Sequence, residues 1–191
     1  MPPRVGKFSN VTFSTTDVEQ WTPELETGQG FRCSRREFIT FWRQGRVQRE
    51  VEASVCSCWI LRHDSALAAY ITLLADKLSA SEGPLLSEEN IQYATFPAIK
   101  IGLLAADIRA KGAGSCLIDW AIEFIATEIA PKIGVRFLTV DALYDPDDGY
   151  DVSEYYKRWG FEFAYPDEPL PPSDGFRTLY LDLLPFIEAL R

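Results

Sequence analysis

An apolar run, Ala98–Ala106, leads through a glycine-containing turn into an amphipathic helix. The run predicts a buried strand, and the helix predicted over Ser115–Ile129 follows the turn Arg109–Gly114 directly. In such a unit the free N–H groups and the positive dipole end of the helix face the turn. Gly112 and Gly114 let backbone approach a ligand closely and adopt positive φ. The unit therefore predicts an α/β fold with an anion-binding turn, suited to a group such as a pyrophosphate.

Two cations reinforce this turn, because Arg109 and Lys111 both lie in it. The turn lacks the Gly-x-Gly-x-x-Gly pattern of a Rossmann site and the Gly-Lys-Ser/Thr pattern of a P-loop. A Gly-x-Gly turn before a helix also occurs in proteins that bind no nucleotide. The interpretation therefore depends on the rest of the chain.

The remaining segments predict a mixed sheet with helices on its faces. A helix is predicted over about residues 34–50, where Ser34 and Glu37 have capping-box spacing. A second short helix, Val152–Trp159, is closed by Gly160. The other predicted strands are Ser54–Arg62 and Leu67–Leu78, joined by a turn at His63–Ser65, then Val135–Val140, Phe161–Tyr165 and Thr178–Leu184.

Composition bounds the class of protein. A chain of 191 residues is typical of one domain, expected here to span residues 1–191, and 47% apolar residues suffice for a core. The net charge of −9 argues against a general nucleic-acid coat protein. No apolar run reaches the length of a membrane span, and the opening MPPRVGKFSN has no apolar signal core. We therefore expect a soluble, cytoplasmic domain.

Metal chemistry is not expected. The four cysteines contain no Cys-x-x-Cys pair, and the single histidine, His63, cannot complete a zinc cluster. Cys56 and Cys58 lie in an apolar run where alternate residues share a face, so two small buried hydrophobic side chains are expected there.

A second motif follows the glycine turn by about forty residues: Tyr155-Tyr156-Lys157-Arg158-Trp159-Gly160-Phe161. It is similar to the Phe-Tyr-x-x-x-Gly-Phe segment of the GNAT acetyltransferases. The turn Arg109-Ala110-Lys111-Gly112-Ala113-Gly114 resembles that family's Arg/Gln-x-x-Gly-x-Gly/Ala turn, which holds the pyrophosphate of coenzyme A. The likeness extends over roughly residues 54–184. It implies a GNAT-like mixed, strongly twisted sheet of six to seven strands with helices on both faces.

The resemblance also implies an activity, transfer of an acetyl group from acetyl-CoA, as co-substrate and without a metal, directly to a primary amine. The backbone of Leu104 and Ala106 would bind the pantetheine arm. Tyr156 would protonate the departing thiolate, since a phenol and a thiol have pKa values of about 10 and 8.5. The cofactor-binding residues implied are Leu104, Ala106, Arg109, Lys111, Gly112, Ala113, Gly114 and Ser115.

No general base is assigned. The strand Ala98–Ala106 carries no carboxylate, although many relatives place one there. Asp107 and Asp141 lie at predicted strand ends and could accept a proton, directly or through water. Each could equally be a solvated end residue or a cap.

The chain resembles one branch of the family in particular, the toxins of bacterial toxin–antitoxin modules that acetylate aminoacyl-tRNA. Phe31-Arg32-Cys33-Ser34 followed by Glu37-Phe38-Ile39 is similar to a degraded form of their Phe-x-Cys-Gly…Leu-Asp opening, and Thr178-Leu179-Tyr180-Leu181 to their final strand. Ser34 replaces the glycine, and the Leu-Asp pair is not kept.

A stripe of arginines is relevant to the identity of the molecule that would accept the acetyl group. Six arginines fall within a sector of roughly 140° if the first predicted helix is continuous; they are Arg32, Arg35, Arg36, Arg43, Arg46 and Arg49. Such a stripe could contact RNA phosphates. It could also be a solvated face, or pair with Glu37, Glu50 and the acidic loop Asp145–Asp151, and a helix break at Gly45 would undo the alignment.

Three hypotheses remain open on the sequence alone. The protein could acetylate a small or peptide amine, it could be a toxin that acetylates aminoacyl-tRNA, or it could bind acetyl-CoA without turning it over. A homodimer and an antitoxin are possible partners, and no membrane partner is expected.

Overall fold

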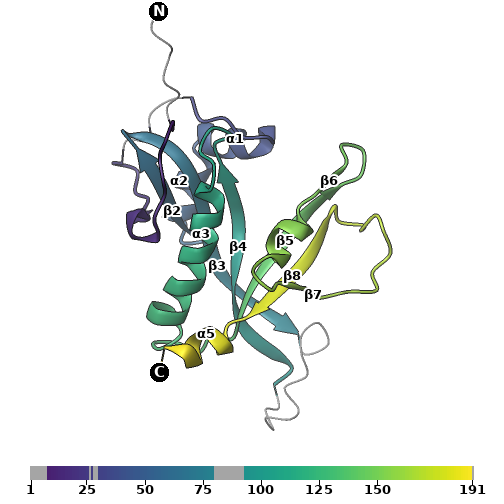
Figure 1. Cartoon of the computed structure of the whole chain (residues 1–191). Coiled ribbons are helices and arrows are strands. Elements are labelled where there is room, and N and C mark those ends of the chain that lie inside the picture. The colour runs from purple at the N-terminus through teal and green to yellow at the C-terminus, as the bar shows by residue number, and fades with distance from the viewer. Residues whose placement is uncertain (1–7, 26, 28–29, 80–92, 191) are drawn as a thin grey trace, which may run out of the picture. The chain divides into compact units, whose positions relative to one another are not determined.

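A computed structural model describes residues 8–25, 27, 30–79 and 93–190 of the chain (Figure 1). The chain divides into two compact units. We call Met1–Leu74 with Gly102–Glu123 the N-terminal unit, and Ala75–Ile101 with Phe124–Arg191 the C-terminal unit. That the whole chain is one folding domain remains a prediction.

Four strands lie side by side in the order β1 (Glu19–Gln20), β2 (Ser57–His63), β3 (Ala66–Ser79) and β4 (Thr95–Ala106). The predicted hairpin is confirmed, because β2 and β3 pair antiparallel. Its turn residues, Asp64 and Ser65, have φ of 47° and 60°. Positive φ at both positions is what a two-residue turn of matching twist requires.

The single helix expected over residues 34–50 is wrong. Gly45 takes φ of 64° in the left-handed region and separates α1 (Arg36–Arg43) from α2 (Arg46–Glu52). Arg35 is the N-cap of α1 and no side chain caps this end, so the expected Ser34 cap does not form. The six arginines therefore do not share one helical stripe.

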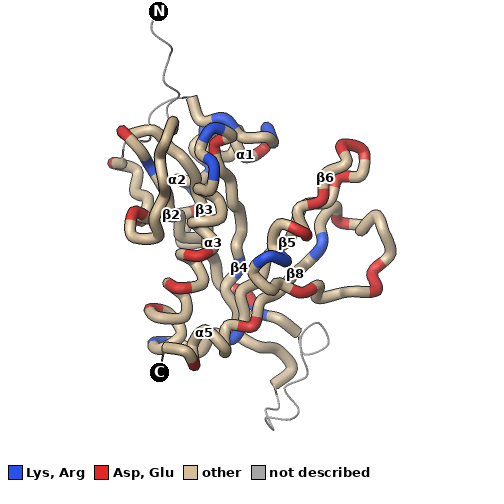
Figure 2. Tube along the Cα trace, in the orientation of Figure 1, with Lys and Arg blue, Asp and Glu red and all other residues tan. Residues whose placement is uncertain are grey.

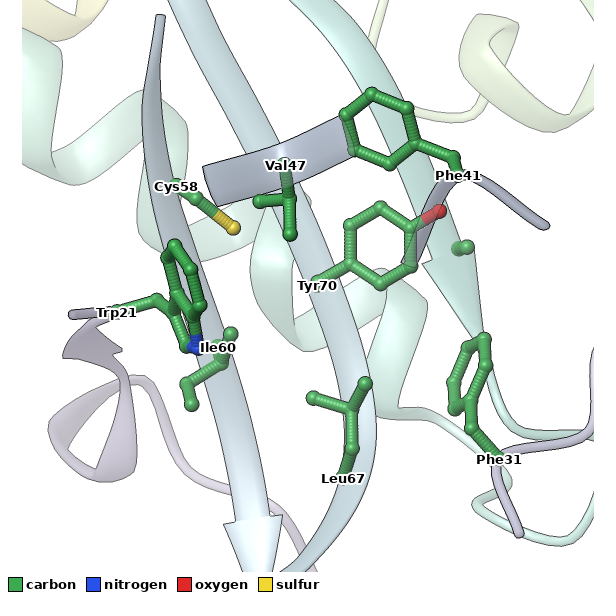
Figure 3. Packing of buried hydrophobic residues seen from close by; sticks show 9 residues of the cluster. Trp21, Phe31, Phe41, Val47, Cys58, Ile60, Leu67 and Tyr70 are labelled. Carbon is green, nitrogen blue, oxygen red and sulfur yellow. The ribbon is translucent and has the colours of Figure 1, made fainter. Parts of the chain in front are cut away.

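An aromatic core fills the N-terminal unit (Figure 3). Tyr70 of β3 is fully buried, its ring stacks on Phe41 at 6.1 Å between centroids, and its hydroxyl donates to the carbonyl of Phe38 at 2.9 Å. The buried members of the core are Trp21, Phe31, Phe41, Val47, Cys58, Ile60, Leu67, Tyr70 and Ala105.

Helices cover both faces of the sheet in this unit. Cys58 and Ile60 of β2 belong to the aromatic core beside α1 and α2. Trp59, between them, contacts Trp120 of α3 (Ala113–Phe124), with ring centroids 4.6 Å apart. Successive side chains of a strand point to opposite faces, so α3 lies on the other side. Cys56 and Cys58 are both buried, as expected for small hydrophobic side chains.

The C-terminal unit is built on β5 (Phe137–Asp145), which pairs parallel with β4 and antiparallel with β8 (Phe176–Asp182). The predicted pairing of the last two strands is confirmed between β7 (Glu162–Phe163) and β8. The unit's core includes Phe96, Phe137 and Tyr180. The remaining short elements of the chain are η1 (Thr15–Asp17), the π-helical η3 (Ile125–Ile129), β6 (Tyr150–Asp151), α4 (Ser153–Lys157) and α5 (Leu184–Ala189).

Within the described residues the strands form one mixed sheet in the order β1-β2-β3-β4-β5-β8-β7, with β6 paired to β5. The predicted α/β class is confirmed. The eight strands exceed the expected six to seven because three of them, β1, β6 and β7, are only two residues long. No helix in the described part of the chain has the length and apolar character that crossing a membrane requires.

Candidate functional site

The glycine turn joins β4 to α3 in the N-terminal unit. Gly112 has φ of 85°, and a Cβ placed on it would meet no heavy atom within 4 Å, so the space over the turn is open. Gly114 lies inside α3, so positive φ is not its role. Among the described residues, the backbone N–H groups of Gly112 and Gly114 have no acceptor. The turn can therefore offer these groups to an anion.

Asp107 is the anchor of this turn. Its side chain is fully buried and accepts two hydrogen bonds from the guanidinium of Arg109, at 2.7 and 2.6 Å. The backbone N–H groups of Arg32 and Arg109 donate to it at 2.9 and 3.0 Å. Burial alone would raise the pKa of Asp107, but these hydrogen bonds outweigh burial and lower it. Asp107 therefore holds the turn as an anion and is poorly placed to act as a base.

The same hydrogen bonds to Asp107 fix the orientation of the Arg109 guanidinium. Its Nη2 group also donates to the carbonyl of Gly30 at 2.8 Å. The Nη1 group has no partner among the described residues, and the side chain is 27% exposed. Arg32 completes the clamp, since its carbonyl accepts from the N–H of Ile108 at 2.8 Å. The segment Phe31–Ser34, which the sequence analysis singled out, thus binds the start of the turn through the backbone of Arg32.

Along β4 beside the turn, the backbone N–H groups alternate between the edge that faces β3 and the opposite edge. The N–H of Leu103 donates to Thr72 Oγ1 at 2.8 Å, and that of Asp107 to the carbonyl of Ala68 at 2.7 Å, so both face β3. Because alternate N–H groups of a strand point to opposite edges, those of Leu104 and Ala106 face away from β3. Pairing of β4 with β5 covers only Ala98–Ile101 of these described strands.

All eight predicted cofactor-binding residues thus lie in one continuous strand–turn–helix segment of the N-terminal unit. Lys111 is exposed, Ala113 is buried and Ser115 is half-buried. Tyr156 belongs to the C-terminal unit.

Tyr156 has a buried ring and an unused hydroxyl. The residue is 6% exposed, and its ring contacts those of Tyr155 and Phe161 at 5.5 and 5.6 Å. The hydroxyl has no hydrogen-bond partner in the described part of the chain. Burial, followed by the neighbouring Tyr155 and Tyr150, raises the pKa of Tyr156. Gly160 has φ of 87°, as expected for the residue that closes this helical turn.

Asp141 lies in a partly exposed polar cluster of the C-terminal unit. It pairs with Lys100 and accepts a hydrogen bond from Thr178 Oγ1 at 2.9 Å. Its side chain is 24% exposed. Asp141 is thus neither a solvated strand end nor a cap, and its contacts leave it no assigned role.

Five of the six arginines around α1 and α2 fall into two groups, and Figure 2 shows positive charge gathered over α1. The sixth, Arg49, donates to the carbonyl of Gln44 at 3.1 Å. Arg35 and Arg46 pair with Glu37 and Glu50. Arg32, Arg36 and Arg43 are exposed and have no ion-pair partner among the described residues.

Sequence reasoning missed a pocket of about 300 Å³, whose lining includes Glu50 and Gly102. A glycine inside an otherwise apolar strand indicates a bulge or a close approach of backbone, and Gly102 is such a residue. That signal could have directed attention to this part of β4.

No family model and no curated protein matches the sequence. Solved structures do match its fold. AtaT complexed with acetyl-methionyl-tRNAfMet aligns with a TM-score of 0.70 and 21% identity, over 91% of this chain and 97% of that chain. A tyrosine-to-phenylalanine variant of KacT aligns with a TM-score of 0.71 and 20% identity, over 91% and 98%.

AtaTR bound with AcCoA aligns with a TM-score of 0.65 and 22% identity, over 91% of this chain and 96% of that chain. The neighbours AtaT and KacT are GNAT-family toxin acetyltransferases of toxin–antitoxin modules. The resemblance drawn from two short motifs is therefore confirmed in the fold. This chain has the GNAT fold, in the form found in the toxins AtaT and KacT.

Proposed function

We propose that this protein transfers an acetyl group from acetyl-CoA to the amino group of an aminoacyl-tRNA. The observation that carries the proposal is the open turn at Gly112, with unused N–H groups and an anchored arginine, on a fold shared with AtaT. Solved structures hold AtaT with acetyl-methionyl-tRNAfMet and AtaTR with AcCoA.

The coenzyme would lie along β4 and over the turn. The N–H groups of Leu104 and Ala106 would pair with the amides of the pantetheine arm, as an added strand does. The segment Gly112–Ser115, together with Lys111, would hold the pyrophosphate, with the N–H groups of Gly112 and Gly114 as donors. Arg109 would donate to the pyrophosphate through Nη1, while Asp107 keeps the guanidinium of Arg109 in one orientation.

Transfer would form a C–N bond as the amine attacks the acetyl carbon, and the C–S bond would break. The departing sulfur would take its proton from the hydroxyl of Tyr156, the amine would lose its proton to water, and the phenolate of Tyr156 would regain a proton from the solvent. The phenol of Tyr156 is protonated near neutral pH, as a general acid must be, although burial raises its pKa further above that of the thiol and so weakens it as an acid. Its ring is held by Tyr155 and Phe161, so only the hydroxyl needs a partner.

The RNA would be recognised by its phosphates. Arg36 and Arg43 are seven residues apart on α1 and so share one face, and Arg32 precedes them. Exposed arginines without ion-pair partners can neutralise phosphates at no cost in broken salt bridges. An antitoxin is also proposed as a partner, because a solved structure holds an AtaT variant with the C-terminus of the antitoxin AtaR.

The first test concerns the turn. Acetyl-CoA at one hundred times its dissociation constant should add about 2.7 kcal/mol to the free energy of unfolding and raise the Tm by several degrees. Gly112→Asp places a charge and a strained side chain where the pyrophosphate must approach. This variant should lose the shift. A shift equal to that of the wild type would place the coenzyme elsewhere.

The second test concerns the acid. Tyr156→Phe removes the hydroxyl and keeps the packing of the ring, so kcat should fall by about 10²- to 10⁴-fold. The Tm shift with acetyl-CoA should stay unchanged. Tyr155→Phe is the matched control and should turn over like the wild type. Normal turnover of Tyr156→Phe across the pH range would show that another group supplies the proton.

The acceptor is tested by a direct screen. The protein is incubated with acetyl-CoA and either charged tRNA or a panel of small and peptide amines, and the acetylated products are identified by mass spectrometry. Acetylation of charged tRNA alone is the expected result. Acetylation of small amines alone would replace the RNA acceptor, and tight acetyl-CoA binding without any product would indicate a binding module.

A further inference from the structure

The pocket of about 300 Å³ lies within the N-terminal unit and outside the glycine turn. Most of its wall is apolar, with Phe38 and Phe41 from α1, Val55 from the segment after α2, and Leu74 from β3. Its volume is at the small end of ligand pockets. It can therefore hold one compact group and not an extended chain.

The charged side chains in the lining of the pocket are Glu37, Glu50 and Arg46, and the guanidinium of Arg46 lies 5.4 Å from the centre of the Phe41 ring. Glu50 is the less exposed of the two carboxylates, at 29% against 51%. Glu50 Oε1 accepts from Arg46 Nε at 3.1 Å. Within the described residues, Glu50 Oε2 has one contact, the thiol of Cys56 at 4.0 Å. Burial and the charge of Glu50 raise the pKa of Cys56, so the thiol stays neutral.

The second oxygen of Glu50 therefore has capacity for a stronger donor than a thiol. An ammonium group would supply one, because charge-assisted hydrogen bonds to carboxylates are the strong ones. Arg46 lines the pocket as well, but it contacts only Oε1 of Glu50 and its side chain is 62% exposed, so Oε2 can take a second partner.

The pocket also reaches β4, the strand along which the coenzyme lies in the proposed function. Gly102 and Leu103 line the pocket, and Leu104 is the next residue of the strand. Two residues of strand span only about 7 Å. A Cβ on Gly102 would lie 2.8 Å from both Leu74 Cδ2 and Thr72 Oγ1, so the strand approaches β3 closely here. A group seated in the pocket thus lies close to the predicted path of the pantetheine arm.

We propose that this pocket receives the amine-bearing end of the acceptor, an α-amino group with an uncharged side chain, and that Glu50 binds its ammonium. The apolar wall takes the side chain. An acidic side chain is disfavoured there, because the apolar wall offers its carboxylate no hydrogen bond. The inference rests on the proposed function for the identity of the acceptor, but amine binding can be measured without any turnover.

The experiment compares leucinamide with 4-methylpentanamide, which has the same side chain and amide but no amino group. Binding to the full-length protein is measured by NMR titration. We expect leucinamide to bind at least tenfold more tightly, and glutamic acid α-amide to bind weakly. Glu50→Gln should remove the preference for the amine. Glu52→Gln is the matched control, since Glu52 is exposed on α2 and bonds to Gln48, and it should keep the preference.

A second variant tests the pocket itself. Val55 is 56% exposed at the pocket, so Val55→Trp should narrow it without disturbing the core, and should weaken leucinamide more than glycinamide. Where turnover is measured, Glu50→Gln should raise the acceptor KM and leave the acetyl-CoA Tm shift unchanged. Equal binding of leucinamide and 4-methylpentanamide, or an unaltered preference in Glu50→Gln, would overturn the inference. Amine binding without any acetyl transfer would keep it and count against the proposed function.

Discussion

Asp107 and Asp141 look equivalent in the sequence, because each follows an apolar run that predicts a strand. In the structure they differ. Asp107 is fully buried and accepts from two backbone N–H groups and a guanidinium with two bonds. Asp141 is 24% exposed and has one hydroxyl donor and one lysine.

The difference shows what makes a carboxylate structural. Backbone N–H groups cannot turn away when their acceptor is lost, so each would remain buried and unpaired at Asp107. The partners of Asp141 are side chains near solvent, and water can replace them. Asp107 thus ties together the turn and the segment around Arg32, whereas Asp141 contributes to a surface network.

The largest expected effect is at Asp107. Asp107→Ala leaves the backbone N–H groups of Arg32 and Arg109 without their acceptor and removes the partner of the guanidinium. The free energy of unfolding should fall by about 3 kcal/mol, as it does when one partner of a buried pair is removed. Urea denaturation measures this loss. A loss below 1 kcal/mol would mean that Asp107 is no more structural than Asp141.

The acid dependence of stability sharpens the comparison. The pKa of Asp107 is lowered in the folded protein, relative to about 3.9 in the unfolded chain. The stabilisation is therefore fully present above pH about 4 and is lost as pH falls through the folded value. Urea denaturation from pH 7 to pH 2.5 should show a shallower acid loss in Asp107→Asn than in the wild type. Identical slopes would show that this carboxylate does not carry the acid sensitivity.

The smallest effect is expected at Asp141. Asp141→Asn removes the charge that pairs with Lys100 and keeps an oxygen for Thr178. A partly exposed ion pair contributes about 0–1 kcal/mol, so the free energy of unfolding should change by less than about 1 kcal/mol. The same urea series measures it, at low and high salt. A loss as large as that of Asp107→Ala would remove the distinction between the two residues.

Local patterns predicted those parts of the fold that local forces decide. The hairpin around Asp64 and Ser65 follows from two apolar runs and a short polar turn. The positive φ of Gly112 and Gly160 follows from a glycine at the boundary of a helix, whereas Gly114, inside α3, does not have it. The helix over residues 34–50 failed at Gly45, because one left-handed residue ends a helix whatever the apolar pattern on either side. The motif around Arg109 was found from the sequence, which predicted that Arg109 binds the pyrophosphate. The sequence did not predict that the same side chain bonds to Asp107 and to the carbonyl of Gly30.

By itself, the sequence determined the strand–turn–helix at Arg109–Gly114, the turn residue with positive φ, and the likeness to one fold family. Spacing and residue type within a few positions are enough for these. Only the tertiary structure decided that Asp107 is buried, that Gly30 and Arg32 clamp the turn, and that Glu50 lines a pocket with Leu74. These partners are distant in the chain, Arg32 and Asp107 by 75 positions. No local pattern encodes such a pairing, because burial and charge neutralisation depend on which segments the folded core brings together.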